Sequence, residues 1–112
     1  MTIKLVDGWY PDEQMNANIR LKNDKFKDSQ LSISYDSSGN AKSVAEMSRS
    51  WVSSSAPAVE TIDINDQTYY YFSSSSSTFV LTTDGPNNLV FKITGQNLSL
   101  DDARSLIENL EF

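Results

Sequence analysis

The sequence contains no histidine and no cysteine, which narrows the chemistry that its side chains can perform. The missing histidine excludes the commonest general acid–base group and all imidazole metal ligands. The missing cysteine excludes disulfides, thiolate catalysis and zinc sites with sulfur ligands. A mechanism that uses only Asp and Glu survives, and so does a hard-cation site with oxygen ligands.

Two acidic clusters are the candidates for those two chemistries: the adjacent Asp101 and Asp102, and the group Asp63, Asn65 and Asp66. The first pair lies where a helix is expected to begin, and acidic side chains there cap amides and complement the helix dipole. The second group lacks the glycine and glutamate of a calcium loop and fits a hairpin turn. We therefore predict no catalytic residues, no metal and no cofactor, and expect that the chain is not an enzyme.

The most unusual feature is the aromatic run at 69–72. Side chains alternate along a strand, so Tyr70 and Phe72 point to one sheet face and their neighbours to the other. Trp9 and Tyr10 form a second aromatic pair, in a segment rich in turn-forming residues. Aromatics that helices leave uncovered are frequent in recognition surfaces. The candidate binding residues for a glycan, another small molecule or a protein are Trp9, Tyr10, Tyr70 and Phe72. The alternative is a minor core in which Trp9 covers Tyr70 and Phe72.

Charge narrows the choice of partner. The formal net charge is -6, which disfavours phosphate backbones and anionic membrane surfaces. No apolar run approaches the roughly 18 residues that a membrane span needs. We therefore expect no nucleic acid and no membrane span. Negative charge also fits an acidic intracellular protein that blocks a basic toxin, which is the alternative function.

Two helices are expected to position these residues, over 43–52 and 100–110. Each begins with a pair of side chains at capping-box spacing, Ser43 with Glu46 and Ser99 with Asp102. Each then carries one apolar stripe at helical spacing. The first stripe is Val44, Met47 and Trp51; the second is Leu100, Ala103, Leu106, Ile107 and Leu110.

Alternating apolar residues predict strands in the rest of the chain. These lie near 17–21, 31–35, 62–64, 67–73, 78–83 and 88–94. Asn65-Asp66 predicts a two-residue hairpin turn, the serines at 73–77 a further hairpin connection, and 53–57 a loop. Short connections favour an antiparallel meander, so the fold class is α+β with the sheet flanked by two or more helices. The predicted core includes Phe79, Leu81, Phe91, Ile93, Leu106 and Leu110.

The order of elements resembles a known group of small bacterial domains. The features that carry the resemblance are Gly8-Trp9-Tyr10, the helix ending near Trp51, the tyrosine-rich meander and the segment 88–112 with its terminal Phe112. They are similar to exported or lipoprotein-borne domains of Gram-positive bacteria with a PsbP-like fold. The resemblance implies an antiparallel sheet flanked by helices, and an extracytoplasmic location at the cell surface or in secreted form. Many members of that group have no known activity, so no catalytic residues carry over.

The sequence thus predicts a single domain over residues 1–112, which is the size of one ordinary domain. Its first residues lack the charged and apolar stretches of a signal peptide, so an exported form would be a piece of a longer chain. The function we expect is a non-catalytic binding or structural role outside the cytoplasm. The cytoplasmic interaction protein is the alternative.

Overall fold

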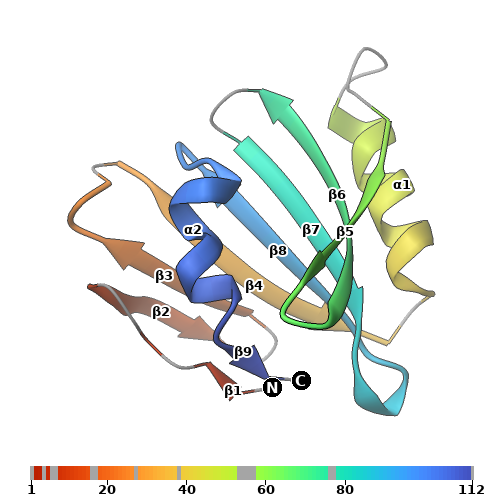
Figure 1. Ribbon diagram of the computed structural model, residues 1–112, viewed down its shortest axis with the longest axis horizontal. Helices are drawn as coiled ribbons and strands as arrows, with labels where there is room; N and C mark the ends of the chain where they lie inside the picture. Colours follow the sequence, from red (N-terminus) through yellow and green to blue (C-terminus); the bar gives the residue numbers. More distant parts are fainter. Residues whose placement is uncertain are drawn as a thin grey trace.

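The computed structural model describes residues 2–3, 5, 8–15, 18–26, 28–37, 39–52, 58–75 and 78–111. The predicted serine loop at 53–57 lies outside these residues. Of the hairpin connection predicted at 73–77, residues 73–75 belong to a strand and 76–77 lie outside the described residues. The strands are β1 (Thr2–Ile3), β2 (Trp9–Met15), β3 (Asn18–Asn23), β4 (Gln30–Asp36), β5 (Glu60–Ile64), β6 (Gln67–Ser75), β7 (Thr78–Asp84), β8 (Val90–Gln96) and β9 (Leu110–Glu111). The helices are α1 (Ala41–Val52) and α2 (Leu100–Ile107), with a 3-10 turn, η1 (Pro86–Asn88), before β8 (Figure 1).

One antiparallel sheet organises the molecule. Its strand order is β2-β3-β4-β8-β7-β6-β5, and each neighbouring pair runs antiparallel. Two hairpin-linked blocks meet in the middle of the sheet, where β4 pairs with β8. A separate ribbon of β1 and β9 brings the first and last described residues side by side (Figure 1). The predicted α+β class with an antiparallel sheet is confirmed.

The two-residue turn between β5 and β6 forms as its sequence predicts. Asn65 and Asp66 both have positive φ, 52° and 65°, and Ile64 pairs directly with Gln67. Positive φ at both central residues is the geometry of the type I′ hairpin, whose twist matches that of the strands. This hairpin sets the register in which the aromatic run of β6 lies.

Strand β2, which holds Trp9 and Tyr10, is not among the strands predicted from the sequence. It occupies the edge of the sheet, where Pro11 is tolerated because no neighbour needs its missing amide proton. The register shifts between Pro11 and Glu13, so the strand also carries a bulge. The turn-forming residues therefore mark an irregular edge strand and not a loop.

Helix α1 begins two residues earlier than expected, and its cap is not the predicted one. The Ser43 amide donates to Asn40 Oδ1 at 2.9 Å, and the Asn40 amide donates to Ser43 Oγ at 3.1 Å. Asn40 is therefore the N-cap and Ser43 lies at the third helical position, where it closes the reciprocal pair. The prediction that Ser43 caps the helix together with Glu46 is therefore wrong.

Helix α2 begins as predicted and ends sooner. The Asp102 amide donates to Ser99 Oγ, and the Ser99 amide donates to the Asp102 carboxylate, which is the complete capping box. The helix ends at Ile107, not at 110. Leu110 lies instead in β9, yet it is still buried, because the chain turns back across the end of the sheet.

The two helices cover opposite faces of the sheet. On one face, α2 packs over a core that includes all the described residues of its apolar stripe except Leu100, which packs at its margin. The core on this side is Trp9, Leu21, Leu31, Ile33, Ile64, Tyr69, Phe79, Leu81, Ile93, Leu98, Ala103, Leu106, Ile107 and Leu110. On the other face, α1 packs on β6, β7 and β8. All the residues predicted for the core are buried, including Phe91.

Truncation of the α2 stripe tests this packing. Leu106 is 0% exposed, so Leu106→Ala is expected to lower the free energy of unfolding by about 3 kcal/mol through lost burial and a residual cavity. Denaturant titration measures the change. Met47→Ala is the matched control, because Met47 is 55% exposed and should change stability by less than about 0.5 kcal/mol. Similar losses in both variants would contradict the assignment of the buried helix face.

A second test concerns the contact between β8 and β7. A Cβ at Gly95 would overlap the ring of Phe79, so the Phe79 ring occupies the space of the missing side chain. We expect Gly95→Ala to destabilise the protein by about 2 kcal/mol or more, as overpacking does. The same change in a Phe79→Leu background should cost at least ~1 kcal/mol less, which a double-mutant cycle by denaturant titration measures. Simple additivity of the two changes would refute the steric explanation.

Candidate functional site

Two of the predicted binding residues belong to the core, on opposite faces of the sheet. Trp9 is 5% exposed and lies on the α2 side, with its ring centroid 6.1 Å from that of Phe26. Phe72 is 1% exposed and pairs with Val80 on the face that α1 covers. Helix α1, and not Trp9, hides Phe72. Neither residue is available to a ligand in this structure.

The other two predicted residues are accessible and far apart. Tyr10 is 39% exposed on β2, and Tyr70 is half-buried on β6. Four strands separate β2 from β6 in the sheet. Tyr10, Tyr70, Trp9 and Phe72 therefore do not come together as one aromatic surface, and of these Tyr10 alone reaches the surface described next.

Polar side chains line the part of the α1-side sheet face that α1 does not cover. Because α1 packs on β6, β7 and β8, the outward side chains of β2, β3, β4 and part of β8 have no described helix over them. Strand register places on this area, which we call the open face, Tyr10, Asp12, Asn18, Arg20, Lys22, Gln30, Ser32, Ser34, Lys92, Thr94 and Gln96. Each of them is exposed or half-buried, and none is aliphatic.

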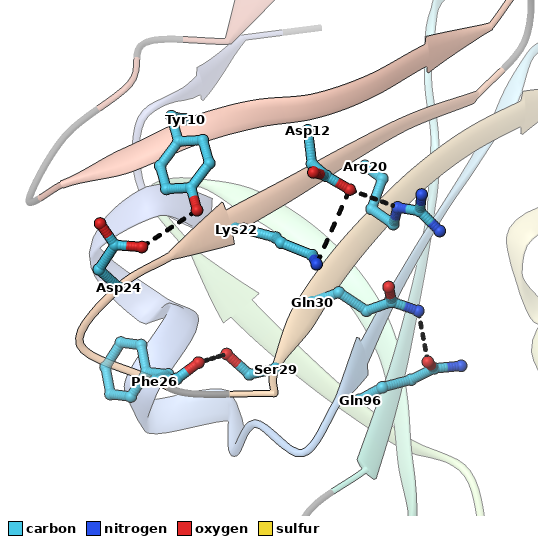
Figure 2. Close-up of polar contacts among 9 residues, drawn as sticks. All are labelled: Tyr10, Asp12, Arg20, Lys22, Asp24, Phe26, Ser29, Gln30 and Gln96. Atoms are coloured by element: carbon cyan, nitrogen blue, oxygen red, sulfur yellow. Dashed lines mark hydrogen bonds and ion pairs between the residues drawn. The ribbon is translucent and has the colours of Figure 1, made fainter.

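Polar contacts order the outer part of the open face (Figure 2). Asp12 Oδ2 lies 3.1 Å from Arg20 Nε and 3.9 Å from Lys22 Nζ, so one carboxylate faces two cations. On the next strands, the Gln30 side-chain amide donates to the Gln96 side-chain oxygen. These pairs are surface contacts of small energetic worth, but together they fix side-chain positions across four strands.

Tyr10 marks the rim of the open face. Its hydroxyl donates to Asp24 Oδ1 at 3.1 Å (Figure 2). The pKa of Tyr10 is raised, mainly because this hydrogen bond stabilises the protonated phenol, with smaller contributions from desolvation and the charges of Asp24 and Asp12. Burial in the core raises the pKa of Tyr69 to about 12. Both phenols therefore act as neutral groups near neutral pH.

A groove runs along the inner border of the open face, between α1 and strands β4 and β8. Its volume is about 490 Å³, within the range of small-ligand sites. The floor carries Ser34 and Lys92, which are directly paired in register on β4 and β8. The wall is apolar, formed by Val44 and Met47 of α1 with Val90 at the base; the lining is completed by Tyr35, Asp36, Gly39, Ser43 and Ser48.

Lys92 places an ammonium group in this groove. Within the described part of the chain, no hydrogen bond or ion pair engages it. With Arg20 and Lys22 it makes three cations on the open face and its groove, where the carboxylates of Asp12 and Asp36 also lie.

The acidic clusters of the sequence have structural partners. Asp102 closes the capping box of α2, and Asp63 accepts a hydrogen bond from the Thr68 hydroxyl at 2.8 Å. The Asn65 side-chain amide donates to the Glu108 carbonyl at 2.9 Å, which ties the β5–β6 turn to the end of α2. Among the described residues, no group of three or more potential metal ligands is present.

Apart from Tyr10, the residues of the open face were not among those predicted for binding, although the sequence carries a signal for them. In 18–22 and 30–34 the polar residues alternate with aliphatic ones, so a row of polar side chains on one sheet face was predictable. Prediction from aromatic residues alone misses this row. The alternation does not show which part of that face a helix leaves uncovered.

Comparison with known proteins identifies a fold. No protein-family model matches the chain, and no curated protein matches it. A protein from Bacteroides thetaiotaomicron VPI-5482, known from a crystal structure at 1.50 Å resolution, is similar with a TM-score of 0.57 and 19% sequence identity. The match covers 93% of this chain and 41% of that one, so the chain spans less than half the length of that protein. The likeness supports the α+β fold and nothing finer. None of the described helices is long and apolar enough to cross a membrane.

The Tyr10 contact gives a test of the rim geometry. In Asp24→Asn, the acceptor charge is lost, so we expect the pKa of Tyr10 to fall back toward its ordinary value. An NMR titration of the Tyr10 ring measures it directly. Asp63→Asn is the matched control, since Asp63 bonds to Thr68 and should leave Tyr10 unchanged. Equal shifts in both variants would show that net charge, and not the hydrogen bond, sets the pKa.

Proposed function

We propose that this chain is a non-catalytic binding domain, and that the open face with its groove is the recognition surface. The observation that carries the proposal is the offset of α1, which leaves a plate of polar side chains beside a groove of about 490 Å³. Sites for small ligands are concave and combine apolar walls with a few placed polar groups. The groove has this composition, with Val44 and Met47 opposite Ser34 and Lys92.

A binding role fits the chemistry of the chain better than catalysis. Histidine and cysteine are absent from the sequence, and the acidic clusters at 63–66 and 101–102 serve a turn and a helix cap. The acidic toxin-blocking function is the alternative, and the cations Arg20, Lys22 and Lys92 on the open face would repel a basic partner there.

The proposal includes a PsbP-like fold and an extracytoplasmic location. The first is supported by the antiparallel sheet with one helix on each face, which is the arrangement that the resemblance implies. The second rests on the resemblance alone. Fractionation of the source cells with an antibody to the chain tests the location, and recovery solely from the cytoplasm would refute it.

A fragment screen tests the binding function. We expect small polar fragments, screened by ¹H–¹⁵N NMR, to shift the amides of β4, β8 and the first half of α1. Ser34→Trp should abolish these shifts, because an indole at this position fills the groove. Ser50→Trp is the matched control, since Ser50 is an exposed residue of α1 that does not line the groove. Hits that gather elsewhere, or that survive Ser34→Trp, would overturn the proposal.

A further inference from the structure

The groove between α1 and strands β4 and β8 combines two opposite charges with an apolar wall. Among the described residues that line it, the charged ones are Lys92 and Asp36. We propose that the groove binds a free α-amino acid with an apolar side chain. The inference rests on the proposed binding function and adds the class of ligand. Its basis is an unpartnered hydroxyl on the buried side of α1, the placement of the two charges and the exposed apolar residues beside them.

Ser48 occupies a position of α1 where an apolar side chain is expected. It follows the fully buried Ala41 and Ala45 on the inward stripe of the helix and is 9% exposed. A helical serine often donates to a carbonyl one turn earlier, as Ser50 does to Met47 at 2.7 Å. The Ser48 hydroxyl has no such bond, nor any other partner within the described part of the chain. Burying a hydroxyl without a partner costs free energy, so its placement favours a ligand that bonds to it.

That hydroxyl opens to the groove. Every side-chain nitrogen or oxygen that is sealed from solvent has a hydrogen-bond partner, for the residues that the structure describes. The Ser48 hydroxyl lacks a partner and is therefore not sealed, and Ser48 lines the groove. An almost buried polar group is thus presented to the space that a ligand would fill.

Two further donors lie on the floor of the groove. Ser34 and Lys92 are opposite each other in register on β4 and β8, which places their Cβ atoms about 5 Å apart. Neither side chain has a hydrogen bond or an ion pair to another described residue. Two hydroxyls and an ammonium group are together matched by a carboxylate, whose oxygens accept only, and whose charge strengthens each bond.

Asp36 supplies the opposite charge further along β4. It lies two residues from Ser34 on the same sheet face, about 7 Å along the strand. Its Oδ1 accepts the Ser37 amide at 2.6 Å, and a carboxylate can accept several more hydrogen bonds. An ammonium and a carboxylate on one carbon can bridge this separation, with a hydrogen bond of about 2.9 Å at each end. A ligand with one charge would instead meet a like charge at one of the two positions, so the pair favours a zwitterion.

The wall of the groove favours an apolar side chain on that zwitterion. Met47 is 55% exposed and Tyr35 is 42% exposed, and both line the groove. Val44 and Val90 complete the apolar part of the lining. A charged side chain would lose water against this wall without gaining a partner, whereas an apolar one removes apolar area from water. Because methionine is flexible and polarisable, the wall can adapt to more than one apolar side chain.

Titration with free amino acids, followed by ¹H–¹⁵N NMR, tests the inference. The probes are leucine, methionine and phenylalanine, each compared with its N-acetyl derivative, which lacks the ammonium, and its amide, which lacks the carboxylate. We expect at least one amino acid to bind and to shift the amides of β4, β8 and α1. Both of its derivatives should bind at least tenfold more weakly, because each leaves one charge of the groove without its partner.

Variants separate the contacts. Lys92→Gln and Asp36→Asn should each weaken binding about tenfold. Lys25→Gln and Asp66→Asn are the matched controls, because these exposed residues lie outside the groove lining, and both should stay within twofold. Ser48→Ala should weaken binding about fivefold and leave the denaturation midpoint unchanged or higher, since no hydrogen bond of the chain is lost. Thermal unfolding shows that each variant is folded.

The remaining outcomes distinguish this inference from the proposed function. If a derivative with one charge binds as tightly as its parent amino acid, or if Ser48→Ala lowers stability and leaves the affinity unchanged, the amino acid site is wrong. If no amino acid binds while other fragments still shift the groove amides, the ligand class is wrong and the binding function stands. If no probe of either experiment reaches the groove or the open face, both fall.

Discussion

The pairing of β4 with β8 is the constraint on which the rest of the structure depends. It runs through seven residue pairs, from Gln30 with Gln96 to Asp36 with Val90, and joins segments that lie far apart in the chain. Without it, the hairpin block β2–β4 and the block β5–β8 would be two smaller sheets, each with an unpaired inner edge. Closing a contact of such sequence separation carries an entropic cost, which the buried aliphatic pairs along it must offset. Ile33 opposite Ile93 is the fully buried centre of that seam.

The same pairing creates the surface that we assign to binding. Residues of β4 and β8 alternate across the seam, so the register that buries Ile33 with Ile93 necessarily sets Ser34 beside Lys92 on the opposite face. Helix α1 is then held to one side of that face. The Ala41 amide donates to the Asp84 carboxylate at 2.9 Å, and the Thr82 hydroxyl donates to the Ala41 carbonyl at 2.7 Å. Because both anchors lie on β7, the helix covers that side and leaves the β4 side uncovered.

Most helices and strands could be predicted from local sequence patterns. The position of the candidate site depends instead on contacts between residues that are far apart in the chain. The turn at Asn65 and Asp66 and the capping box of Ser99 are encoded within a few residues, so they were found from the sequence. Strand β2 was missed because its turn-forming residues occur both in turns and in irregular edge strands. Only the pairing with β3 shows that the segment is a strand. The same limit applies to the aromatics. Alternation placed Tyr70 and Phe72 on one face, but only the anchoring of α1 on β7 determines that Phe72 is covered.

The exposed edges of the sheet explain why a partner would meet its face. At one edge, β2 carries Pro11 and a bulge, both of which interrupt the ladder that an added strand would need. At the other edge, β5 is short and presents the acidic Glu60 and Asp63. Strand addition at either edge is thereby opposed. The open face has no such protection, and its hydroxyls, amides and cations remain solvated unless a hydrophilic partner replaces the water. A net charge of -6 also opposes contact between two copies of the chain.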